Sequence, residues 1–578
     1  MLSINLDDVM QVLTNIRSYL IAFGVVLALA IIVMVAVRKL PKAKKKMIRA
    51  QSGLAILLAL TIVVNLICTG PMSTMLDLVS GSGTISEETS AKATELVNEI
   101  TQEGIVLAQN DDNILPVASG SKLNVFGWAS TSPCYGGTGS GALNDAYPVT
   151  DLLTGLHDAG IETNEELSKF YTDYKADRPS VGMAAQDWTL PEPNVNLYTD
   201  EMMENAKAFS DTAMVVITRV GGEGADLPSG ENGTNDSWIK GQEGDGNYLA
   251  LSAEEKELLQ NLKTLKDNGT FKSIVVLINS SNAIELDFLN PAICGEDYGI
   301  DAAMWIGDVG QTGINGVGQL LSGAVTPSGS LVDTYLYDNM ANPAMYNFYT
   351  QAYPNAAEYN LLTEGADVQG MYSVYQEGIY LDYRYYETRY EDTILGQGNA
   401  DSAVGTKAST DGWNYAEEVC FPFGYGLSYT NYEYSLDKLD YNSDTDTFTA
   451  TVTVSNTGDR DGKATVELYG QSPYTDYDKQ NNVEKSSIQL LGYDKIDVAA
   501  GASETVTVDV PGYFLASYDA NGAKGYILDA GDYYFAVGNG AHEALNNVLA
   551  VKCGDAVAGK LIDQDGNVVT GNTAAVAT

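Results

Sequence analysis

Carboxylates are the main residues in this sequence that could do acid–base chemistry. The only histidines are His157 and His542, so the sequence favours neither a histidine metal cluster nor a Ser-His-Asp triad, and it contains no G-x-S-x-G elbow. Its five cysteines are scattered and form no CxxC pair, which argues against a zinc site and against a disulfide framework. The sequence therefore implies no metal and no organic cofactor, and we expect any catalysis from aspartate or glutamate.

Glu223 is the carboxylate whose neighbours best suit a reactive site. It lies in the segment GGEGAD, between Gly222 and Gly224, where the lack of side chains lets the backbone approach a ligand closely. A carboxyl group on such a loop could protonate a leaving group. Asp226, two residues further on, could cap a helix or bind a ligand. An exposed loop glutamate in a very acidic protein would look the same, so spacing alone leaves both interpretations open.

A second glycine-rich loop, GGTGSG at 136–141, superficially resembles a phosphate cradle. It lacks the Lys-Ser/Thr of a P-loop and does not complete G-x-G-x-x-G, so a nucleotide site is disfavoured. Its glycines are better explained by close approach of the backbone to a bulky neutral ligand. The candidate ligand-binding residues are Tyr135, Gly137, Thr138, Gly139, Ser140 and Asp226.

Both loops follow short apolar runs that are typical of strands buried on two faces. Helical segments alternate with these runs, and the clearest, at 252–269, begins with Ser252 and Glu255 spaced as a capping box. The alternation predicts an α/β sandwich, a mostly parallel sheet with helices on both faces. Because ligands bind beyond the carboxyl ends of such strands, we expect the loops that follow the runs to meet at one edge. The runs lie at 123–127, 213–218, 273–279 and 302–307.

The N-terminal segment, 1–79, is predicted to be a membrane anchor. Apolar runs at 19–37 and 53–72 reach the ~17–25 residues that cross a bilayer, although one span plus one buried helix is an alternative. The basic stretch RKLPKAKKKMIR between them is expected in the cytoplasm by the positive-inside rule. The remaining domains would then lie on the extracytoplasmic side of the cell membrane.

Charge and texture describe the rest of the chain. A formal net charge of −44 argues against nucleic acid and anionic lipid as partners, and it suits a neutral ligand such as a sugar. From residue 431 the pattern changes to period-2 alternation with turn signals such as NTGDRDG, which predicts an all-β antiparallel sandwich over 431–553. The tail, 554–578, is small and polar, and we expect it to be flexible.

Several motifs in a fixed order resemble glycoside hydrolase family 3, in its β-glucosidase-like branch. The resemblance covers about residues 95 to 550 and implies an α/β sandwich domain over 85–430, braced by a fibronectin type III-like domain over 431–553. The motifs that carry it are EGIVLAQNDDNILPV, VFGWASTSPCYGGTGSG, GGEGADLP, SIVVLINSSNAIELDFL, MWIGDVGQTG, PSGSLVDTY, YQEGIYLDYRYYET, FPFGYGLSYT and IQLLGYDKIDVAAG.

The resemblance implies retaining hydrolysis of terminal β-linked sugars, which needs two carboxylates ~5–5.5 Å apart. The family's acid/base glutamate lies in an S-G-E-G-type loop that falls on Glu223, although Gly221 stands where the family has serine. The family's nucleophile is an aspartate, usually in an S-D-W motif on a separate (β/α)-barrel domain, and we find neither motif nor barrel repeat in this sequence. One branch of the family places that barrel last. We therefore expect this chain to supply the acid/base half, with a barrel encoded downstream or separately.

An oligosaccharide or β-glucoside is the implied substrate. Tyr383, Tyr385 and Tyr386 in YRYYET could line the sugar cleft, or they could pack at a sheet edge or domain interface, and the sequence leaves both open. The alternative function is a non-catalytic cell-surface remnant that binds carbohydrate or protein and lacks the nucleophile domain.

Overall fold

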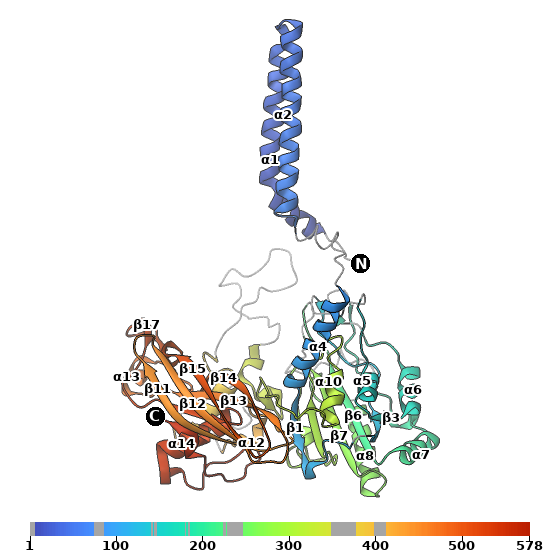
Figure 1. Cartoon of the computed structure of the whole chain (residues 1–578), viewed down its shortest axis with the longest axis vertical. Coiled ribbons are helices and arrows are strands. Elements are labelled where there is room, and N and C mark those ends of the chain that lie inside the picture. Colours follow the sequence, from blue (N-terminus) through green and yellow to red (C-terminus); the bar gives the residue numbers. More distant parts are fainter. Residues whose placement is uncertain are drawn as a thin grey trace, which may run out of the picture. The chain divides into compact units, whose positions relative to one another are not determined.

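The computed structural model describes residues 6–73, 86–118, 120–139, 143, 147–179, 181–182, 185–223, 227, 247–347, 377–397 and 412–578 (Figure 1). The chain forms two compact units, Met1–Ala91 and Lys92–Thr578.

The first unit contains two long helices that lie side by side, α1 (Leu6–Ala36) and α2 (Lys42–Thr69) (Figure 1). The segments Ile16–Lys39 and Lys42–Thr69 are long and apolar enough to cross a membrane, and most of their residues are not buried. Their length and composition suit the two predicted spans, although a signal sequence can share these properties.

A six-stranded sheet with the order β1-β8-β7-β6-β2-β3 is the frame of the second unit. Neighbouring strands are parallel, except that β1 runs antiparallel to β8 at one edge. All four predicted runs are strands of this sheet, which confirms a mostly parallel sheet. The strands are β1 (Val106–Asn110), β2 (Lys122–Phe126), β3 (Glu162–Thr163), β6 (Thr212–Arg219), β7 (Ser273–Ser280) and β8 (Ala302–Trp305).

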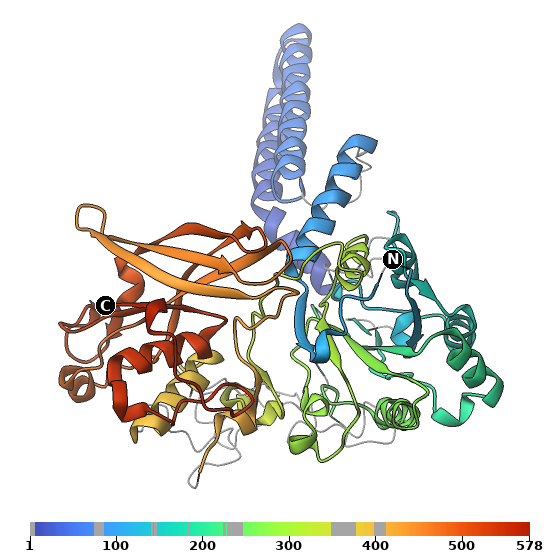
Figure 2. The same cartoon turned by 60° about the horizontal axis from the view of Figure 1, so that its bottom comes forward.

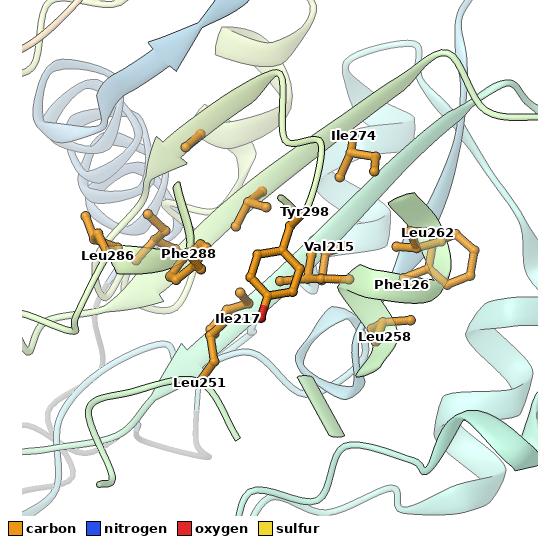
Figure 3. Packing of buried hydrophobic residues seen from close by; sticks show 14 of the residues in the cluster. Phe126, Val215, Ile217, Leu251, Leu258, Leu262, Ile274, Leu286, Phe288 and Tyr298 are labelled. Atoms are coloured by element: carbon orange, nitrogen blue, oxygen red, sulfur yellow. The ribbon is translucent and has the colours of Figure 1, made fainter. Parts of the chain in front are cut away.

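Apolar residues of the sheet alternate between two cores, one on each face. On β6, Val215 and Ile217 join the core beneath α6, α7 and α8, where Leu258 of α8 also packs (Figure 3). Met214 and Val216 join the opposite core, which α5 and α10 cover. The predicted capping box of Ser252 and Glu255 begins α8. The helices are α5 (Leu152–Asp158), α6 (Glu165–Tyr174), α7 (Asp200–Phe209), α8 (Ala253–Asp267) and α10 (Asn315–Leu321).

Two antiparallel sheets form the C-terminal module, with the orders β11-β12-β15 and β14-β13-β18-β19. Apolar residues of both sheets share one core, as the alternating pattern after residue 431 predicts. Figure 2 shows the orange strands of this module beside the red helix α14 (Ala541–Cys553), which packs on β18. The strands are β11 (Tyr432–Asn442), β12 (Thr447–Asn456), β13 (Gly462–Gln471), β14 (Gln489–Val498), β15 (Ser503–Pro511), β18 (Tyr534–Gly538) and β19 (Val576–Ala577).

A separate aromatic core joins α14 to α11 (Tyr383–Leu395) and α12 (Tyr415–Glu418). Tyr383, Tyr385 and Tyr386 are buried here, so the structure favours interior packing over a sugar cleft for all three.

The tail after Gly554 was expected to be flexible, and that prediction is wrong. Val557 and Leu561 are buried in the aromatic core, and Ala575 is buried in the core of the two C-terminal sheets. Strand β19 then pairs with β18. The three buried residues of this tail, Val557, Leu561 and Ala575, are separated in the sequence by exposed or half-buried ones, so the small and polar composition gives no sign of these anchor points.

Candidate functional site

The loops that follow β2 and β8 are joined by hydrogen bonds to each other and to the carboxyl end of β7. The backbone N–H of Cys134 donates to Asn279 Oδ1 at 2.6 Å, and Asn279 Nδ2 donates to the carbonyl of Gly307 at 2.7 Å. The N–H of Gly310 donates to the carbonyl of Tyr135 at 2.6 Å. A buried amide at the end of β7 therefore holds its two neighbouring loops in place.

The loop after β6 carries Glu223 and lies directly against the 136–139 loop. Thr138 Oγ1 donates to the Glu223 carbonyl at 2.6 Å, and the Thr138 N–H donates to the Gly221 carbonyl at 3.3 Å. At Gly139, a Cβ would lie 2.7 Å from Glu223 Cβ and 2.8 Å from Glu223 Oε2. The Glu223 side chain itself is exposed to solvent. Its side chain thus lies directly over the glycine loop, in the space that a side chain at position 139 would need.

Both described ends of the loop that carries Glu223 are tied to one buried guanidinium. Arg219, the last residue of β6, donates to Glu255 at 2.9 and 2.7 Å and to the carbonyl of Tyr248 at 2.6 Å. The Tyr248 hydroxyl accepts from the N–H of Val220 at 3.0 Å. Arg219 therefore joins the exit from β6 to the approach to α8.

Burial shifts the protonation of three groups around the same sheet edge. It raises the pKa of the Cys134 thiol to about 12, with the charge of Asp308 adding to the effect, so this cysteine stays a neutral thiol. Burial also raises the pKa of Tyr135 to about 12 and raises the pKa of Asp308. Asp308 was not among the predicted site residues, although its place in GDVGQTG, three residues after β8, is the signal that could have found it.

The structure brings together part of the predicted ligand-binding set. Thr138 and Gly139 lie against residues 221–223, and Tyr135 is partly buried against the second core of the sheet. Gly137 also lies close to this segment. A Cβ added to Gly137 would be 3.2 Å from the carbonyl oxygen of Gly221. Ser140 and Asp226 lie outside the described residues.

This arrangement can place a proton donor beside a neutral ligand. Thr138, which is predicted to bind a ligand, donates its hydroxyl to the backbone carbonyl of Glu223 and so helps to hold the glutamate in place. Across the described part of the chain, no group of three or more His, Cys, Asp or Glu residues could hold a metal ion.

Two family models match the chain. Residues 105–383 match the glycosyl hydrolase family 3 C-terminal domain, and residues 464–541 match the fibronectin type III-like domain. The first match begins one residue before β1 and includes all six strands of the sheet.

Curated relatives and solved structures agree with these matches. A beta-glucosidase of Ruminococcus albus is 30% identical over 460 residues, which is 78% of this chain and 40% of that protein. An exo-alpha-(1->6)-L-arabinopyranosidase of Bifidobacterium longum is 27% identical over 80% of this chain and 49% of its own length. The structure of a beta-glucosidase from Paenibacillus barengoltzii aligns with a TM-score of 0.59 at 30% identity, covering 77% of this chain and 41% of that one.

The chain spans about half the length of the curated relatives that it matches or less. The structure of beta-glucosidase 3B from Thermotoga neapolitana in complex with glucose likewise aligns over 78% of this chain and 53% of that one, with a TM-score of 0.57 at 26% identity. This chain therefore carries the C-terminal domain of glycosyl hydrolase family 3, together with a fibronectin type III-like domain.

Proposed function

We propose that this chain supplies the acid/base half of a retaining, β-glucosidase-like glycosidase, with Glu223 as the general acid and base. Glycoside hydrolysis is the activity of the family, which implies a glycoside substrate. The observation that carries the proposal is the contact of Glu223 with Thr138 and Gly139 at the edge where the loops of the parallel sheet meet.

In this role Glu223 gives its proton to the glycosidic oxygen as the bond to the sugar breaks. The same group, now a carboxylate, takes a proton from the water that releases the sugar from the nucleophile. The nucleophile is an aspartate of a (β/α)-barrel domain, encoded downstream or on a separate chain, placed ~5–5.5 Å from Glu223. Thr138 and the 221–223 backbone hold the donor in place, and the missing side chain of Gly139 leaves the space that Glu223 occupies.

The proposed location is the extracytoplasmic side of the cell membrane. Support comes from the two long apolar helices and from the basic stretch that separates them. A substrate met outside the cell would be an oligosaccharide or β-glucoside, and the acidic surface does not hinder the approach of a neutral sugar.

The test compares aryl β-glucosides that differ in how readily the phenol leaves. The full chain in detergent micelles is assayed alone and together with a separately produced family 3 barrel domain containing S-D-W. With the barrel, we expect hydrolysis, and Glu223→Gln should slow the substrate with the poor leaving group by about 10²–10⁴-fold. A dinitrophenyl glucoside needs little protonation, so its first step should be much less affected, and added azide should restore turnover.

Glu504→Gln is the matched control, because Glu504 is an exposed carboxylate on β15 of the other module. It should leave both rates unchanged. Hydrolysis by the chain without a barrel, lost in Glu223→Gln, would mean that this chain holds both carboxylates and that the half-site proposal is wrong. Equal loss on all leaving groups would contradict the role of Glu223 as proton donor. If no barrel restores activity, the non-catalytic binding protein becomes the better account.

A further inference from the structure

The C-terminal module presents an unusual set of exposed aromatic rings. On the hairpin of β16 (Ser517–Asp519) and β17 (Gly525–Ile527), Tyr518 faces Tyr526 across the strands, and their ring centroids lie 5.3 Å apart. Tyr526 is 76% exposed and Tyr518 is 56% exposed. Aromatic side chains of this size are normally well covered, so two such rings held side by side in solvent indicate a contact surface.

Two more rings immediately precede the hairpin. Tyr513 and Phe514 lie in η11 (Gly512–Leu515), with centroids 4.5 Å apart, and Tyr513 is 64% exposed. We call the paired rings of Tyr518 and Tyr526 the aromatic platform; Tyr513 and Phe514 precede it in the chain. Strand β17 lies near α13 (Asp476–Asn481) at one end of the module (Figure 1).

The hairpin is firmly mounted, although strands of three residues are weak by themselves. Asp519 points to the other face of β16 and is fully buried. Its carboxylate accepts from the Tyr477 hydroxyl at 2.6 Å and from the N–H groups of Asn521, Gly522 and Ala523. Because alternate residues of a strand face opposite sides, this anchor holds Tyr518 outward. The rings are therefore pre-positioned, and binding would cost little ordering entropy.

The chemistry of the platform fits a neutral polysaccharide. A tyrosine offers a flat apolar face for the C–H side of a sugar ring and a hydroxyl at its rim for the sugar hydroxyls. The net charge of −44 disfavours a polyanion. At about 200 Å² per fully exposed ring, the exposed parts of Tyr518 and Tyr526 offer roughly 260 Å² of surface, short of the ~800 Å² per partner of a stable protein interface.

We infer that the aromatic platform is a second glycan contact, which holds a neutral polysaccharide chain on the C-terminal module. It lies on different elements from the Glu223 loop, so it does not depend on catalysis. A module of this kind would keep a chain bound through many encounters with the reactive site, because the two contacts together raise the effective concentration of the glycan.

The experiment measures retention of the full chain, in detergent micelles, by insoluble cellulose, xylan and mannan, with polygalacturonate as a polyanionic comparison. We expect retention by at least one neutral polymer, and about tenfold weaker binding in Tyr526→Ala and in Tyr518→Ala. Tyr493→Ala is the matched control, since Tyr493 is 72% exposed on β14 of the same module but outside the platform. It should bind like the parent chain.

Each other outcome overturns the inference. Failure of the parent chain to bind any neutral polymer, unchanged binding in the platform variants, or an equal loss in Tyr493→Ala would each do so, as would preferential binding to polygalacturonate. Circular dichroism and thermal unfolding check that the variants remain folded, which exposed positions should allow. Glu223→Gln should retain full polymer binding, so failure of the catalytic proposal and failure of the platform can be told apart.

Discussion

Gly139 is a residue of the candidate site with little room for a side chain. Its φ of +66° lies in the left-handed region, and a Cβ would overlap the side chain of Glu223. We expect Gly139→Ala to destabilise the fold and to lower activity of the barrel-completed enzyme, because the alanine methyl group must displace the glutamate.

Gly310→Ala is the control for this change. Gly310 has a φ of +70°, but nothing lies within 4 Å of its Cβ position. It should show only the backbone cost of about 1–2 kcal/mol, so a larger loss at Gly139 measures the overlap. Urea unfolding of both variants makes the comparison. Equal losses in stability, with activity equally preserved, would contradict the crowding at Gly139.

Glu192 is a buried carboxyl group that should make the stability of the folded protein depend on pH. Burial raises its pKa to about 8, while the Trp128 N–H at 2.7 Å and the Tyr198 hydroxyl at 3.1 Å hold its oxygens. Between pH ~4.5 and ~8 the folded state keeps this proton and the unfolded state loses it. Stability should therefore be highest at the acid end of this window and should fall as pH rises towards 8, by at most ~1.4 kcal/mol per pH unit.

Glu192→Gln removes the proton and keeps the shape. Urea midpoints measured from pH 5 to pH 8 should then change less with pH than in the parent chain, although Glu285 and Glu467, whose pKa values burial raises to about 7, will leave part of the slope. Glu504→Gln should leave the slope unchanged. A slope that is as steep in Glu192→Gln as in the parent would show that Glu192 does not keep its proton.

At the scale of elements, Arg219 joins β6 to α8. Its guanidinium is buried and paired with Glu255, which also caps α8 through Ser252. We expect Arg219→Met to destabilise the protein by about 3–5 kcal/mol, because it leaves a buried carboxylate unpaired. Arg219→Met combined with Glu255→Gln should cost less than the sum of the two single changes. A double-mutant cycle by urea unfolding tests this, and strict additivity would argue against coupling between the two elements.

Elements with a clear pattern of their own, such as a continuous apolar run, could be predicted from the sequence, and an element whose pattern merges with that of its neighbour could not. Runs such as SIVVLIN are covered on both faces, so β6, β7 and β8 were predicted close to their observed ends. Strand β1 was missed because its apolar residues continue the helical periodicity of α4 (Glu87–Gly104). Gly104, the last residue of that helix, was the available signal.

The candidate site divides in the same way. The meeting of the glycine loops follows from parallel strands, whose carboxyl ends share one edge, and the contact of Thr138 with Glu223 agrees with it. The tie between Arg219, Tyr248 and Glu255 could not be predicted, because it joins side chains up to 36 residues apart with no local pattern. The role of Glu223 rests on family resemblance and stays a proposal.

At the scale of the whole molecule, the proposed membrane orientation can be tested directly. Protease added to intact cells that produce the chain should remove the domains after residue 72 and spare the basic stretch at 38–49. The physical reason is the cost of moving several cationic side chains across the bilayer. Detergent-permeabilised cells are the control, in which both parts should be cut. Protection of the C-terminal module in intact cells would contradict the orientation.

The place of β1 in the sheet also has a consequence for how the chain is made. β1 ends at Asn110, but β8, with which it pairs in the described part of the sheet, begins at Ala302, about 190 residues later. At roughly 5–20 residues per second, a ribosome needs on the order of 10–40 s to cover that distance. During this interval β2 and β6 can already pair, while the backbone N–H and C=O groups of β1 have no strand partner and its apolar side chains stay uncovered. Of the strands in this sheet, the first to be synthesised is therefore among the last to be paired. Until β8 is made, other molecules must be kept from pairing with the open edge of β1.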